Sequence, residues 1–182
     1  ALACSEIVMG KHSSLGPIDP QIMGIPAHGV IEEFDRARIE IGQRPEMIPV
    51  WQPLIAKYPP AFIGECEKAI EWSKEMVKEW LVSGMFAGDA KAEAKADAVV
   101  AELADHAITK SHARHISPEK AVSLNLNVSP LESDPALQEA VLSVHHACIH
   151  NLSATPAYKI VENHKGVAFI QQLGQLVLSR PS

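Results

Sequence analysis

A loop near the start of the chain gathers side chains that can exchange protons. His12 and Asp19 lie within residues 10–20, a segment whose glycines free the backbone and whose prolines fix it at defined points. The loop follows the apolar run Ile7–Met9, which predicts a buried strand. Loops of this kind hold polar side chains at the rim of a sheet, where sites are common. The simpler alternative is that His12 is loop surface and Asp19 a turn residue before a proline.

Nine histidines raise the question of a metal site. The best case is His145, His146 and His150, because the last two are one helical turn apart on the same face. A third ligand would come from elsewhere, for instance His112 or His115, and no carboxylate stands at a Glu-x-x-His spacing. The pattern therefore favours backbone hydrogen bonds or a subunit contact, and no metal is predicted.

Helical periodicity covers most of the remaining chain. The predicted helices are 25–41, a short one within 44–60, 62–82, one that Asp89 caps, 118–124 and 135–152. The predicted extended segments are 125–128 and a terminal hairpin formed by 158–161 and 167–171. These elements predict the α/β class with a large helical share. The predicted division is a domain over 1–128 with a helical insertion and a helix-and-hairpin extension over 129–182.

Composition excludes several function classes. A net charge of −6 without a dense basic run excludes a nucleic-acid track. Glycine-rich phosphate-binding signatures are absent, so no nucleotide or other cofactor is predicted. The three cysteines, Cys4, Cys66 and Cys148, are far apart and odd in number, which favours a reducing compartment. No apolar stretch approaches the roughly 20 residues of a membrane span, so a cytoplasmic or a membrane-associated location remains open.

Four stretches of the chain resemble one known family. They are residues 1–21, including Glu-Ile-Val-Met-Gly-Lys-His-Ser-Ser-Leu-Gly-Pro-Ile-Asp-Pro-Gln, the Lys-Tyr-Pro-Pro of 57–60, and residues 105–116 and 159–170. They are similar to the serine dehydrogenase proteinase family, which belongs to the Clp protease/crotonase group and is related to signal peptide peptidase A. The resemblance implies the C-terminal part of a Clp/crotonase-like spiral core in a longer protein. It also implies a serine peptidase acting on polypeptides and assembling as a homo-oligomer.

The resemblance further implies that the nucleophilic serine lies a few residues upstream of Ala1. A serine hydroxyl attacks only when a neighbouring base takes its proton. Asp19 occupies the position of the Clp histidine, and Lys57 lies at roughly the distance at which bacterial signal-peptide peptidases place their lysine. With His12, these are the three candidate base or acid residues. Each has a structural alternative as loop surface, turn residue or solvated helix end.

The segment that begins at Ser117 resembles a later element of the same group, which has the pattern Ser-Pro-Glu-x-Ala-x-x-x-Gly-Leu-Val. Ser117 and Pro118 begin a short helix, and Asn125 replaces a glycine while still tolerating a left-handed backbone. His112, Arg114 and His115 precede this helix and would fall near the third active-site element, although a structural role is favoured.

The alternative function is a non-catalytic crotonase-like scaffold subunit whose tryptophans and proline-broken helices form interfaces.

Overall fold

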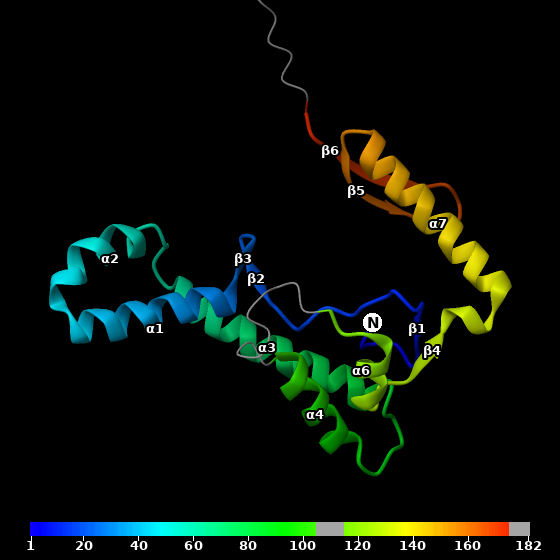
Figure 1. The fold of residues 1–182 in the computed structure, drawn as a ribbon, viewed down its shortest axis with the longest axis horizontal. Coiled ribbons are helices and arrows are strands. Elements are labelled where there is room, and N and C mark those ends of the chain that lie inside the picture. Colours follow the sequence, from blue (N-terminus) through cyan, green and yellow to red (C-terminus); the bar gives the residue numbers. More distant parts are fainter. Residues whose placement is uncertain (105–114, 175–182) are drawn as a thin grey trace, which may run out of the picture. The chain divides into compact units, whose positions relative to one another are not determined.

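The computed structural model describes residues 1–104 and 115–174 (Figure 1). Helices make up 56% of it and the sheets are small, which confirms a mixed α/β class with a large helical share. The chain divides into two compact units, Ala1–Pro130 and Leu131–Ser182. The predicted boundary lies two residues earlier, between 128 and 129.

The first unit contains two parallel strands that are far apart in sequence. β1 (Ile7–Met9) pairs with β4 (Val128–Pro130), with Ile7 opposite Val128. The predicted strand at Ile7–Met9 is confirmed. The other elements of this unit are β2 (Gln21–Ile22), β3 (Ile25–Pro26), α1 (Ala27–Gln43), η1 (Pro45–Met47), α2 (Ile48–Ile55), α3 (Phe62–Ser83), α4 (Ala92–Ala104) and α6 (Pro118–Ser123).

Two buried clusters form the core of this unit, and α3 contributes to both. In the first half of α3, Phe62, Cys66 and Ile70 pack with Ala27 and Val30 of α1. In the second half, further apolar residues recur at helical spacing and pack with β1, α4 and α6. Figure 1 shows α3 running beside α1 and then beside α4. The predicted amphipathic helix is confirmed.

The second half of α3 buries Val77 and Leu81 in the larger cluster. The two tryptophans of this helix do not lie in the core: Trp72 is 66% exposed and Trp80 is also exposed. Burial along α3 therefore follows a narrow stripe, with the indole rings beside it on the surface.

Caps and left-handed residues explain how α6 begins and ends. The Ser117 hydroxyl accepts a hydrogen bond from the Lys120 backbone N–H at 3.3 Å, and Pro118 occupies the first helical turn. Asn125 then takes a φ of 65°, the left-handed conformation expected for it. The predicted helix is confirmed. Of the predicted extended exit over 125–128, Asn125 lies in a turn and Val128 begins β4.

The expected helix start at Ile25 is wrong. Residues Ile25–Pro26 form β3, which pairs antiparallel with β2, and the helix begins at Ala27. The two residues of the connecting turn, Met23 and Gly24, both have positive φ, as a two-residue type I′ hairpin requires. The turn was missed because methionine is an unusual residue in its first position.

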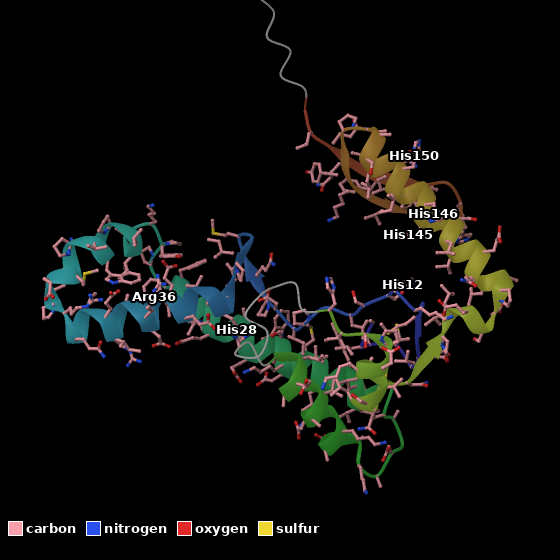
Figure 2. All side chains as sticks on the ribbon, viewed as in Figure 1. His12, His28, Arg36, His145, His146 and His150 are labelled. Carbon is pink, nitrogen blue, oxygen red and sulfur yellow. The ribbon has the colours of Figure 1, made fainter. Side chains whose placement is uncertain are left out.

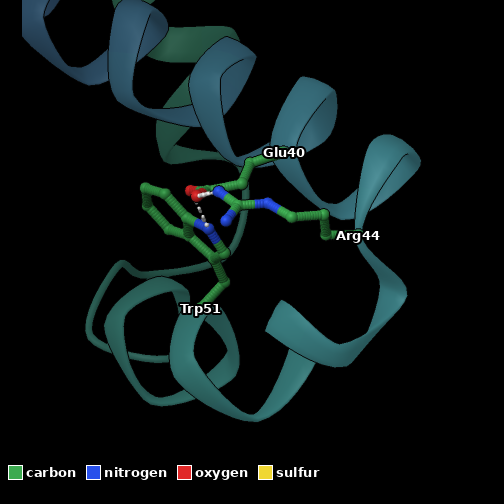
Figure 3. A network of polar contacts seen from close by, with 3 residues as sticks. All are labelled: Glu40, Arg44 and Trp51. Atoms are coloured by element: carbon green, nitrogen blue, oxygen red, sulfur yellow. Dashed lines mark hydrogen bonds and ion pairs between the residues drawn. The ribbon is translucent and has the colours of Figure 1, made fainter.

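A polar network joins α1 to the proline-rich segment that follows it (Figure 3). The Trp51 indole N–H donates to Glu40 Oε2 at 2.9 Å, and the Arg44 guanidinium bonds to the other oxygen of the same carboxylate. Arg36 stacks over the Trp51 ring at 5.0 Å. These contacts bury Trp51 and hold the short helix α2, which tolerates Pro53, against α1.

The second unit consists of η2 (Leu131–Ser133), α7 (Pro135–Ala154) and a hairpin of β5 (Ala157–Glu162) and β6 (Ala168–Gln172). Asp134 caps α7 by accepting from the backbone N–H groups of Ala136 and Leu137 at 3.0 Å. The predicted helix and hairpin are both confirmed. In residues 1–104 and 115–174, we find no helix with the length and apolarity that crossing a bilayer would need.

Candidate functional site

The loop after β1 is anchored at several points by backbone hydrogen bonds. Leu15 forms an antiparallel bridge with Ile116, in which each backbone N–H donates to the other's carbonyl at 3.0 Å. Ile18 N–H donates to the Leu103 carbonyl at 3.0 Å, which attaches the loop to the end of α4. The loop therefore has a defined path from the carboxyl end of β1 to the β2–β3 hairpin.

The bridge brings two side chains together that are about a hundred positions apart in sequence. Ser14 Oγ lies 3.0 Å from His115 Nδ1, within hydrogen-bonding distance, and both side chains are exposed. A neutral imidazole with its proton on Nε2 accepts from the hydroxyl, and the other tautomer donates to it. A serine hydroxyl against an imidazole is an arrangement that can transfer protons.

A pocket of about 220 Å³ includes Leu15, the residue after Ser14, in its lining, but neither Ser14 nor His115 lines it. Leu15 and Gly16 of the loop form one part of its wall, and Leu2, Trp80 and Leu103 are among the other lining residues. Its lining is mainly apolar, so it suits an apolar side chain more than an ion.

His12 and Asp19 lie on the same loop but in different surroundings. Figure 2 shows His12 on the segment after β1, where its side chain is exposed. Asp19 is half-buried, and its Oδ1 atom is inaccessible to solvent. Its neighbour Ile18 packs against the larger buried cluster. Of the two side chains, Asp19 is therefore the one more shielded from solvent.

Lys57 lies in a different place, on the wall of a pocket of about 410 Å³. Other lining residues are Met23 and Ile25 of the β2–β3 hairpin, Glu33 of α1, and Tyr58. Neither His12 nor Asp19 lines this pocket. The structure thus brings His12 and Asp19 onto one loop and places Lys57 at the smaller buried cluster.

The polar part of the Lys57 pocket is a hydrogen bond between Tyr58 and Glu33. The Tyr58 hydroxyl donates to Glu33 Oε2 at 2.9 Å. This bond, followed by burial of the ring, raises the pKa of Tyr58 above its ordinary value. The Tyr58 ring also stacks on Phe62 at 5.6 Å, which ties the pocket to the start of α3. The pocket is lined mainly by apolar side chains, together with the Lys57 amine and the Glu33 carboxylate.

Within the described residues, the histidines of α7 do not form a metal cluster with other ligands. Figure 2 shows His145, His146 and His150 along this helix, and the first two rings lie 5.9 Å apart. In the part of the chain that the structure describes, no group of three histidine, cysteine or acidic side chains is placed to hold a metal ion. The candidates His112 and Arg114 lie outside the described residues.

Sequence reasoning placed His115 near a site but did not pair it with Ser14. The pairing depends on the Leu15–Ile116 bridge. Both residues are apolar and lie in extended segments far apart in the sequence, and these local properties do not predict that the two segments pair. Compared with known proteins, the chain matches no family model, no curated protein and no solved structure.

Proposed function

We propose that this chain is part of a serine peptidase of the Clp and signal-peptide-peptidase group. The proposal rests on the resemblance of four sequence stretches and on one structural observation. That observation is the parallel pair β1–β4 with a hydrogen-bonded loop at the carboxyl end of β1. In open α/β sheets, sites lie beyond the carboxyl ends of parallel strands.

In this proposal the attacking serine precedes Ala1 in the full-length protein. Its hydroxyl oxygen bonds to the carbonyl carbon of a peptide bond while a base takes the hydroxyl proton. The carbon–nitrogen bond then breaks, and the proton passes to the leaving amine. Water afterwards cleaves the acyl ester with the same base assisting. Backbone N–H groups would stabilise the negatively charged oxygen of the tetrahedral intermediate.

Four residues are proposed as candidates for the base. Lys57, Asp19 and His12 come from the sequence, and the geometry adds His115, because its imidazole lies within hydrogen-bonding distance of a serine hydroxyl. The pocket lined by Leu2 and Leu15 is the proposed position for an apolar substrate side chain. This placement is consistent with a serine that enters from the segment before Ala1.

A fluorophosphonate probe tests the proposal on the full-length protein. Covalent labelling of a serine upstream of Ala1, with proteolysis of an unfolded polypeptide, would support it. The variants H115A, K57A, D19A and H12A should then differ, because only loss of the true base abolishes labelling. The variant H164A is a matched control, since His164 is an exposed histidine in the β5–β6 turn. A folded full-length protein that resists the probe would contradict the proposal.

The second candidate function is a non-catalytic scaffold subunit of crotonase type. One observation favours it: the indole of Trp72 is mostly exposed on α3, and large exposed aromatic side chains are enriched at protein interfaces. In the same probe experiment, this function predicts no labelling together with assembly into oligomers that W72A weakens.

A further inference from the structure

The pocket beside Lys57 lies within the first unit and is lined by segments that are separate in the sequence. The β2–β3 hairpin, Glu33 of α1 and the segment 54–62 each contribute to it. Its volume of about 410 Å³ falls in the range of small-molecule sites, which is about 300–1,000 Å³. The apolar side chains of its lining are those of Met23, Ile25, Leu54, Pro59 and Phe62. The pocket can therefore accommodate an apolar group of a small ligand.

Two side chains of opposite charge also line this pocket. Glu33 is half-buried, and its Oε2 atom accepts the hydrogen bond from the Tyr58 hydroxyl. A carboxylate has further acceptor positions, so Glu33 can also bind a cationic group. Lys57 forms no ion pair with any residue that the structure describes, Glu33 included. A ligand with one charge would be attracted by one of these groups and repelled by the other, whereas a zwitterion is attracted by both.

The tip of the β2–β3 hairpin gives an independent indication of a ligand. Met23 has a φ of 55°, and asparagine, aspartate and glycine are the residues that favour this turn position. Its side chain is 82% exposed and belongs to neither buried cluster, so neither the turn nor the core explains a methionine here. It does line the pocket. Unfavourable backbone conformations are concentrated at ligand sites, and methionine side chains adapt readily to apolar ligands.

We propose that this pocket binds a free α-amino acid with a large apolar side chain, such as leucine, methionine or phenylalanine. The carboxylate of the ligand pairs with the Lys57 ammonium, and its ammonium group pairs with the Glu33 carboxylate. Its side chain packs among the apolar lining residues, Met23 included. The proposal goes beyond the peptidase proposal and does not depend on it. The base of the peptidase would then be one of the other three candidates.

Titration of the full chain with L-leucine tests the proposal, with NMR of isotope-labelled methionine methyl groups as the local readout. The Met23 methyl signal, identified by its absence in M23N, should shift and reach saturation. Two analogues separate the charges, because leucinamide lacks the carboxylate and N-acetylleucine lacks the ammonium group. Each should bind about tenfold more weakly than leucine, since each loses a charge-assisted hydrogen bond.

The variants K57Q and E33Q test the two ion pairs. Glutamine at position 33 keeps an oxygen that can accept from Tyr58, so E33Q removes the charge without removing that acceptor. K57Q should weaken the binding of leucine but not of leucinamide, and E33Q should weaken leucine but not N-acetylleucine. A merely structural effect would weaken all three ligands alike. The matched controls K68Q and E46Q change exposed side chains outside the pocket and should leave binding unchanged.

The variant M23N separates binding from folding. Because asparagine favours this turn position, M23N should be at least as stable as the parent chain without ligand. Calorimetry should nevertheless show weaker binding of leucine. Unchanged affinity in M23N would overturn the proposed role of Met23 in the pocket.

Three further results would overturn the proposal. Leucine could show no saturable binding up to its solubility limit. K57Q or E33Q could weaken all three ligands equally. Leucinamide could bind as tightly as leucine, which would replace the free amino acid by the N-terminal residue of a peptide. None of these measurements uses peptidase activity, so failure of this proposal is distinguishable from failure of the peptidase proposal.

Discussion

The two units differ in where their large apolar side chains lie. In the first unit, α3 places apolar residues at helical spacing into two buried clusters, and Leu81 is completely buried. In the second unit, α7 has a comparable periodic apolar face, yet none of its residues is buried. Periodicity therefore predicts that a helix has an apolar face, while burial depends on whether another element lies against it. Among the residues that the structure describes, the first unit supplies such an element from within, and the second does not.

The largest effect that tests this difference is loss of a core leucine. Leu81→Ala should lower the free energy of unfolding by about 2–5 kcal/mol, because it leaves a cavity between α3 and α4. Leu142→Ala on α7, where the side chain is 39% exposed, should cost less than about 1 kcal/mol in the dilute chain. Urea denaturation measures both. Equal losses would mean that α7 has a core of its own.

A pair of glycine substitutions tests the packing of α3 at its two ends. A Cβ on Gly84 would lie 2.7 Å from the Trp80 carbonyl oxygen, so Gly84→Ala should destabilise the first unit by about 1–3 kcal/mol. Gly64 lies inside the helix with open space around it, so Gly64→Ala should stabilise the protein by about 0.5–1 kcal/mol. Thermal unfolding of the two variants should shift in opposite directions. A loss of stability in Gly64→Ala would argue against this start of α3.

The cap of α7 should contribute more to that helix than any single packed side chain does. Asp134→Ala removes the acceptor for two backbone N–H groups and should lower the local opening free energy of the first turn by about 1 kcal/mol. Hydrogen exchange at Ala136 and Leu137 measures the change. Asp134→Asn keeps the accepting oxygen and should behave nearly as the parent chain does. No change in exchange after Asp134→Ala would contradict the capped helix start.

The smallest effect concerns the pH dependence of the first unit. The hydrogen bond to Glu33 raises the pKa of Tyr58 in the folded chain, so the folded state keeps the phenol proton to higher pH than the unfolded state does. The stabilisation is complete below the unfolded pKa, near 10.0, and is lost as pH rises through the folded value. Denaturation between pH 9 and pH 11, about one pH unit either side of an ordinary tyrosine, should show this decline. Tyr58→Phe should remove it, and a decline that persists would assign it to another group.

Local signals in the sequence predicted most of the elements. Ser117 and Asp134 stand where helices begin, and Asn125 stands where the backbone turns left-handed, because each of these side chains has a direct stereochemical role in its own turn. The β2–β3 hairpin was not predicted, because Met23 occupies a turn position with positive φ and methionine is not a residue typical of turns.

Local sequence patterns could not predict which distant segments contact each other. The pairing of β1 with β4 and the approach of His115 to Ser14 each join segments about a hundred positions apart. Their sequences show that they are extended and partly apolar, but not which segment each one meets. For the candidate site, sequence patterns led to the hypothesis that the loop of His12 and Asp19, and Lys57, take part. It did not indicate that Lys57 would line a separate pocket with Glu33 and Tyr58.

The surroundings of Trp51 give the protein an intrinsic optical reporter. Its indole is 3% exposed, is bonded to the Glu40 carboxylate and lies under the Arg36 guanidinium, whereas Trp72 and Trp80 face solvent. Replacing the two exposed tryptophans by phenylalanine would leave Trp51 as the one tryptophan, and its emission would report on the junction of α1 with α2. Loosening of that corner could then be followed separately from melting of the α3–α4 core.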